Sequence, residues 1–126
     1  MDAEPNRKAS RKMDNHKEGQ LATAHAQELD SVREQKLLLQ ALQAMRDGNF
    51  DIRMPGDWTG MNGKIADTFN EIVSANAHLA RELDRVGQSL GKQGHTAQRV
   101  RCDQRRGKWG EMENSVNSLI DDLLWP

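Results

Sequence analysis

Apolar side chains recur along residues 65–90 at alternating intervals of four and three residues. Seven of the eight positions in this series are apolar, and Asn76 is the exception. This spacing is the a/d pattern of a left-handed coiled coil, in which neighbouring helices cover the apolar seam of each helix. The sequence therefore predicts a long helix whose burial depends on a partner. The predicted seam consists of Ile65, Phe69, Ile72, Asn76, Leu79, Leu83, Val86 and Leu90.

One polar residue interrupts this seam. With Ile65 at a d position, Asn76 falls at an a position, where a buried amide fixes register and strand number at some cost in stability. The alternative is that Asn76 lies where the helix turns away from its partner. The first interpretation predicts that Asn76→Ile raises stability and loosens the oligomeric state.

Helix-forming residues also dominate residues 21–46, which contain neither glycine nor proline. Leu38, Leu42 and Met45 share one helical face there, and Gly48 is expected to end the helix. The polar residues 1–20 show no periodicity, so we expect them to form a disordered arm.

Between the two predicted helices, three apolar residues alternate with polar ones, which predicts an extended connector over residues 49–63. Its apolar residues, expected to pack along a helix, are Phe50, Ile52 and Met54. A second connector over residues 91–110 is rich in glycine and arginine. A C-terminal helix over residues 111–125 then resumes the heptad spacing with Met112, Val116, Leu119 and Leu123.

The chain contains an internal repeat. The segment from Gly60 to Ile65 aligns with the segment from Gly107 to Met112, 47 residues later, and Asn70 aligns with Asn117. Each unit is a helix, a connector, a Gly-x-x-Gly step and a second helix. The long middle helix belongs to both units, so we expect a first unit over residues 21–82 and an overlapping second unit over residues 76–126.

The connectors are long enough to run back along the preceding helix, whereas a short loop would leave the two helices antiparallel. The resulting prediction is an all-α fold with parallel helices. Two chains side by side would form a parallel four-helix coiled coil, with the connectors packed in its grooves.

Composition agrees with a shared core. Only 36% of residues are hydrophobic and 4% are aromatic, which is little for a compact domain of 126 residues. The formal net charge is -1, so no overall field attracts nucleic acid or an acidic membrane. No segment approaches the length of a transmembrane helix. The expected location is the cytoplasm, at the membrane only through a partner.

The residues that carry reactive groups do not form a recognisable catalytic or metal-binding set. The four histidines have no ligand spacing for zinc and lack the acidic neighbour of a phosphoacceptor histidine. A phosphate-binding loop is absent. We therefore expect no enzyme activity, no cofactor and no metal, with Cys102 and the pair Asp121-Asp122 on the surface. The histidines are His16, His25, His78 and His95.

A cluster of basic residues in the second connector, next to Trp109, offers an alternative function. Such a cluster can grip phosphates while an indole stacks on a base, as in nucleic-acid-binding proteins. The alternative is thus a nucleic-acid-binding coiled-coil dimer. The basic residues are Arg99, Arg101, Arg105, Arg106 and Lys108.

These motifs together resemble the HAMP domain, the helix–connector–helix signalling module of sensor histidine kinases and chemoreceptors. The likeness covers residues 36–126. It rests on Gly48-Asn49-Phe50 at the end of the first helix, the Phe69-Asn70 pair, Asp57-Trp58-Thr59-Gly60, and the run from Ser115 to Leu123. The most similar pattern is that of the tandem HAMP arrays of hybrid histidine kinases.

The resemblance implies a homodimer that relays conformational change along a parallel helical bundle in a two-component system, with a histidine kinase or other signalling protein as partner. The chain departs from the HAMP pattern in its Arg-rich second connector and in lacking an acidic residue before Gly63 and Gly110. The family's ATP-binding motifs are also absent, so we expect a truncated relative without the kinase core.

Overall fold

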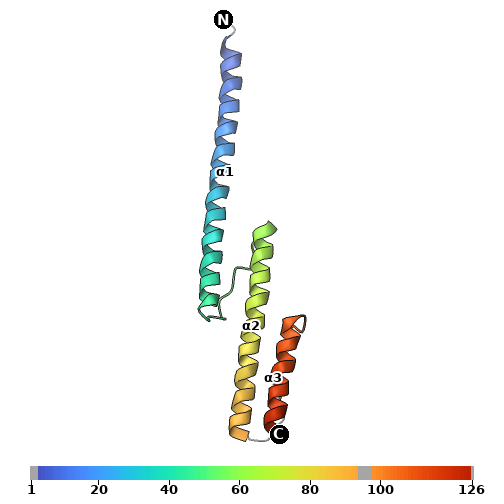
Figure 1. Ribbon diagram of the computed structural model, residues 1–126. Coiled ribbons are helices and arrows are strands. Elements are labelled where there is room, and N and C mark those ends of the chain that lie inside the picture. The colour runs from blue at the N-terminus through green and yellow to red at the C-terminus, as the bar shows by residue number, and fades with distance from the viewer. Residues whose placement is uncertain (1–2, 94–97, 126) are drawn as a thin grey trace. The chain divides into compact units, whose positions relative to one another are not determined.

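The computed structural model describes residues 3–93 and 98–125, and the side chains of residues 12–90 and 98–125. These residues form three helices and no strand: α1 (Ala3–Arg46), α2 (Gly60–Gln93) and α3 (Lys108–Leu124), shown in Figure 1. The predicted all-α class is therefore confirmed for the described part of the chain.

The chain divides into two compact units, residues 1–40 and 41–126. In the first unit, the described residues belong to α1, which begins at Ala3. The sequence predicts a disordered arm over residues 1–20, and the helix found there contradicts it. The lack of an apolar period in this segment did not indicate disorder, because a helix that is exposed on all sides needs no apolar stripe. The straight-chain residues and alanines of this segment have high intrinsic helix propensity.

In the second unit, α1 ends where the sequence predicts. The Gly48 N–H donates to the Met45 carbonyl at 3.0 Å, and the Asn49 N–H donates to the Ala44 carbonyl at 2.9 Å. This pair of bonds is the Schellman motif, which needs a left-handed residue after the helix, and Gly48 supplies it with φ 93°.

The connectors are shorter than predicted, because both following helices begin early. The first connector covers residues 47–59 instead of 49–63, since α2 begins at Gly60. The second lies between Gln93 and Lys108 instead of over 91–110, and its described part is 98–107. Residues 94–97, with the predicted candidate His95, lie outside the described residues.

Helices α2 and α3 lie side by side and run in the same direction (Figure 1), and the described part of the second connector packs with both. One hydrophobic cluster joins the three segments. Its buried members are Val86 of α2, Val100 and Cys102 of the connector, and Ile120 of α3. The predicted parallel return of the chain is thus found in this half of the unit.

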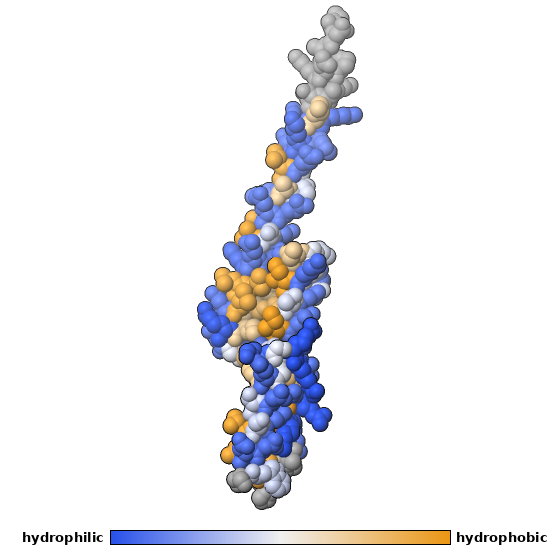
Figure 2. Space-filling model, turned by 45° about the vertical axis from the view of Figure 1, so that its right-hand side comes forward, coloured by the Kyte–Doolittle hydropathy of each residue, from blue (hydrophilic) through white to orange (hydrophobic). Residues whose placement is uncertain are grey.

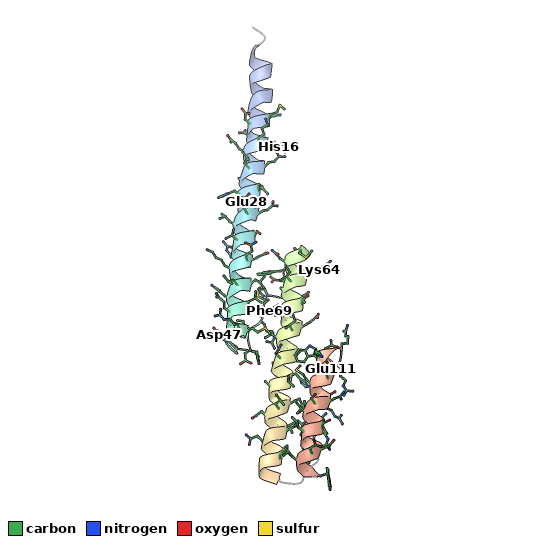
Figure 3. All side chains as sticks on the ribbon, viewed as in Figure 1. His16, Glu28, Asp47, Lys64, Phe69 and Glu111 are labelled. Atoms are coloured by element: carbon green, nitrogen blue, oxygen red, sulfur yellow. The ribbon has the colours of Figure 1, made fainter. Side chains whose placement is uncertain are left out.

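A second group of buried residues lies further toward the N-terminus of the unit. Phe69 is 4% exposed and Val73 is fully buried on α2, while Met54 of the first connector is 5% exposed (Figure 3). Phe50 and Ile52 are partly buried. The other buried hydrophobic residues of this group are Ala41, Ala66 and Ala77.

Candidate functional site

Each connector is fastened to the following helix by an asparagine side chain. The Asn70 amide accepts a hydrogen bond from the Met54 N–H at 2.7 Å and donates one to the Met54 carbonyl at 3.0 Å. Asn117 does the same with Val100, at 2.8 and 3.1 Å. We call these two arrangements the connector clamps. In each, one side chain satisfies both backbone groups of a buried connector residue, which would otherwise remain unpaired.

The Gly-x-x-Gly steps also have the same structure in both repeats. Gly60 and Gly107 have φ of 64° and 56°, in the left-handed region that favours glycine. A Cβ on Gly63 would collide with the carbonyl of Trp58, and one on Gly110 would collide with the carbonyl of Arg105. Both glycines thus let the connector backbone pass close to the first turn of the next helix.

Burial follows the same repeat. Val73 and its equivalent Ile120 are buried, at 0% and 4% exposure, whereas the preceding residues Ile72 and Leu119 are 48% and 62% exposed. Equivalent residues thus share hydrogen bonds, backbone conformation and burial. These features give the sequence repeat a structural counterpart.

The two repeats differ at one buried position. Ala66 of the first repeat corresponds to Glu113 of the second, which is 8% exposed and accepts a hydrogen bond from the Cys102 N–H at 3.0 Å. The second connector has one more residue than the first between its clamp and its Gly-x-x-Gly step. Burial, followed by the charge of Glu113, raises the pKa of the Cys102 thiol. The prediction of a surface thiol is therefore wrong, since Cys102 is 7% exposed.

A polar network fastens the second connector to α2. Arg85 donates to both carboxylate oxygens of Glu82, at 3.2 and 2.8 Å, and also to Gln98 and to the Arg99 carbonyl. Glu82 also accepts from the Arg101 N–H at 3.1 Å. The hydrogen bond from Arg85 is the main cause that lowers the pKa of Glu82 to about 2. Sequence reasoning missed this network because its contacts between α2 and the connector join residues 13 to 19 positions apart.

Most of the basic residues in the Arg-rich connector have acidic partners. Arg99 pairs with Asp121, Arg105 lies 3.5 Å from Glu113, and Lys108 lies 2.6 Å from Glu111. Residues 98–125 contain five basic and five acidic side chains. The connector is therefore not a free basic patch. Asp121 is exposed, as its sequence suggests, while it pairs with Arg99.

The predicted coiled-coil seam is only partly buried within the single chain. Phe69 and Val86 are buried, while Leu79 and Leu90 pack against the cluster shared with α3. Asn76 is partly buried and donates to the Ile72 carbonyl of its own helix at 2.8 Å. The remaining seam residues are exposed: Ile65 at 38%, Ile72 at 48% and Leu83 at 43%.

The exposed seam continues on α3. Met112 and Leu119, the equivalents of Ile65 and Ile72, are 40% and 62% exposed, and Leu123 is 75% exposed. Exposed apolar side chains appear as orange atoms on the face shown in Figure 2. A groove between the two helices is lined by Leu79 and Leu83 of α2 and by Met112 and Val116 of α3, among others. We call these exposed residues of α2 and α3, with the groove, the open seam.

The buried face of α2 changes along its length. In the first half the buried positions are Ala66, Phe69, Val73 and Ala77. In the second half the inward-facing positions are Val86, which is buried, and the partly buried Leu79 and Leu90, which pack in the cluster with α3. At about 100° per residue, the two faces differ by about 120°. A heptad analysis missed Ala66, Val73 and Ala77 because it follows the single stripe that runs the whole length of the helix.

Among the described residues, no group of three or more His, Cys, Asp or Glu side chains is placed to hold a metal ion. Within the same residues no helix is long and apolar enough to cross a membrane. His16 interacts with Gln20 on α1, and His25 is exposed, as the sequence suggests for surface histidines. His78 differs, because it contacts the second connector.

No model of a known protein family matches the chain, and no solved structure matches it.

Proposed function

We propose that this protein is a signal-relay module of two overlapping HAMP-like repeats, which pairs with a second copy as a parallel four-helix coiled coil. In this proposal it passes conformational change along the bundle in a two-component system. The open seam is the observation that carries the proposal. Its apolar side chains recur at heptad spacing on two parallel helices, and a coiled-coil partner buries residues spaced in this way.

Burial energy supports a partner for this surface. Isolated exposed apolar residues are common on proteins, but a continuous apolar stripe is typical of an interaction site. Covering one leucine or isoleucine side chain contributes roughly 1.5–3 kcal/mol when it is buried completely. Ile65, Ile72 and Leu83 are still 38–48% exposed, so each has much of this energy left to gain.

The shared helix supports the relay mechanism. α2 carries the clamp of the first repeat on one face and packs against α3 with a face turned by about 120°. Because a helix is stiff about its own axis, a rotation of α2 in the first repeat also turns the surface that it presents in the second. An input at one end thereby biases the packing at the other.

The proposal includes the expectation that the chain is not itself an enzyme. Kinase activity would require ATP binding, and the sequence has none of the motifs that hold ATP. Measurable ATP binding by the purified chain would contradict this part. The competing nucleic-acid hypothesis has less support, because Arg99, Arg105 and Lys108 are already paired with carboxylates. A salt-sensitive mobility shift lost on changing Arg105 and Arg106 would favour it.

Sedimentation equilibrium of the full chain at tens of micromolar tests the proposal. We expect a dimer, and a folded helical monomer at this concentration would overturn it. Cysteines placed in a Cys102→Ser background test the orientation. In a parallel dimer, Ile65→Cys and Leu83→Cys each form a disulfide with the same position of the second copy. An antiparallel pair would give only the mixed disulfide between the two variants. Arg81→Cys, about 200° around the helix from Leu83, is the control that should not cross-link.

A further inference from the structure

His78 joins α2 to the second connector through both of its ring nitrogens. Its Nε2 atom lies 2.7 Å from the Arg101 carbonyl oxygen, and its Nδ1 atom lies 3.5 Å from Asp103 Oδ2. The His78 side chain is 24% exposed, and that of Asp103 is 75% exposed. None of the other contacts that hold this connector depends on a histidine.

Hydrogen-bond chemistry makes this arrangement depend on a proton. A carbonyl oxygen only accepts, so the hydrogen of the neutral ring lies on Nε2. The Nδ1 lone pair then faces a carboxylate oxygen, which is a repulsive arrangement. A second proton on Nδ1 turns this contact into an ion pair, because the imidazolium donates from both nitrogens.

The charged groups around the ring come from two elements. On α2 they are Glu82, whose carboxylate acts electrostatically with His78, and the exposed Arg81. On the connector they are Asp103 and Arg101, whose backbone N–H is bound by Glu82. Within the described residues, no hydrogen bond or ion pair joins His78 to α3. Two carboxylates, Asp103 and Glu82, thus lie near the ring, and Glu82 is already engaged by Arg85.

We propose that His78 is a proton-operated latch on the second connector. With a proton on both nitrogens, it binds Asp103 and Arg101 together and holds the connector against α2. With one proton, it holds the connector through the Arg101 carbonyl alone. Histidine changes its charge between about pH 5 and pH 8, so the latch responds in the physiological range.

The latch would act on one repeat only. The position equivalent to His78 in the first repeat is Val32, 46 residues earlier, which is also the offset between Met54 and Val100, and valine does not titrate. Acidification would thus tighten the second connector without a matching change in the first. The idea that the latch regulates the relay rests on the proposed function. The contacts of the latch itself lie within a single chain.

Cys102 is a reporter placed next to the latch. It is the single cysteine of the chain, it is 7% exposed, and it lies between Arg101 and Asp103. When the connector lifts from α2, its thiol becomes accessible to 4,4′-dithiodipyridine, a reagent that works at acidic pH. The change with pH in the labelling rate of the full chain relative to a variant then measures opening. Asp103 itself raises the pKa of the thiol, so its removal shifts the rate, but below that pKa it does so by the same factor at each pH.

The variants are His78→Gln, whose amide still donates to the Arg101 carbonyl but does not titrate, and Asp103→Asn at an exposed site. At about pH 5.5 the wild-type thiol should react about two- to fivefold more slowly than that of either variant, as expected for a partly exposed ion pair. At about pH 8 the wild-type rate should equal that of His78→Gln, and its ratio to the rate of Asp103→Asn should be higher than at about pH 5.5 by the same two- to fivefold factor. Asp122→Asn, an exposed carboxylate on α3, is the control that should label like the wild type.

The inference fails if the ratio of wild-type to His78→Gln rates is the same at both pH values. It also fails if Asp103→Asn retains the protection of the wild type at the lower pH. Circular dichroism confirms that the variants are folded, and sedimentation separates the two proposals. A dimer without pH-dependent protection overturns the latch alone, whereas a monomer with such protection overturns the relay alone.

Discussion

The clamp formed by Asn117 makes the sharpest prediction about stability. Its side chain makes two hydrogen bonds with Val100, whose side chain is fully buried. Asn117→Ala removes both bonds and leaves the Val100 N–H and carbonyl without this partner. Each bond contributes about 1 kcal/mol, the unpaired buried groups add a further cost, and alanine gains a little in helix propensity. We therefore expect the free energy of unfolding to fall by about 2–3 kcal/mol.

Urea unfolding followed by circular dichroism measures this loss. Protein concentration is held fixed, because the stability of a dimer depends on it. For a folded unit of this size, the same change lowers Tm by roughly 10–20 °C. Asn114→Ala is the matched control: Asn114 is exposed on the same helix, so its replacement should leave stability unchanged or raise it slightly.

An aspartate at the same position separates the two bonds. Asn117→Asp still accepts from the Val100 N–H, but its carboxylate cannot donate to the Val100 carbonyl and repels it. We expect a loss at neutral pH at least as large as that of the alanine variant. Below about pH 4 the protonated acid donates again, so the gap to the wild type should narrow. Equal stability of Asn117→Ala and Asn114→Ala would refute the reasoning.

Two further predictions concern the close approach at Gly110 and the network around Glu82. Gly110→Ala should destabilise the protein strongly, because its Cβ would collide with the Arg105 carbonyl. Gly87→Ala has open space on α2 and should raise stability by about 0.5–1 kcal/mol. If thermal unfolding showed both variants shifting Tm in the same direction, the result would contradict this geometry. Glu82 has its pKa lowered to about 2, so it stabilises the folded state above the ordinary carboxyl range, and this contribution of about 1–2 kcal/mol is lost as pH falls from about 5 toward 2. Urea midpoints of the wild type and of Glu82→Gln, measured between about pH 5 and about pH 2, should therefore converge as the pH falls. If the difference between the two midpoints were the same at about pH 5 and at about pH 2, the result would count against the network.

The repeat and the helices were accessible from sequence because they depend on local chemistry. Glycines at an offset of 47 marked the two places where the backbone needs a left-handed residue and a close approach, and Gly48 marked the end of α1. The error at residues 1–20 has the same origin, since an exposed helix leaves no periodic pattern. The Phe69-Asn70 pair and its partner Val116-Asn117 were visible as a repeat, but not the bonds that their asparagines make across 16 and 17 residues.

Sequence alone determined the all-α class, the two connectors and the heptad seam, because propensity, turn residues and periodicity act over a few neighbouring residues. Only the tertiary structure decided which part of that seam a single chain covers. It also decided that Arg99 and Arg105 of the second connector are paired with carboxylates and that His78 faces Asp103. Those contacts join residues 8 to 25 positions apart in sequence on separate elements, and their distances depend on how the connector returns along α2. The open seam is the part of the heptad pattern that a single chain leaves exposed, and it is the observation behind the proposed dimer.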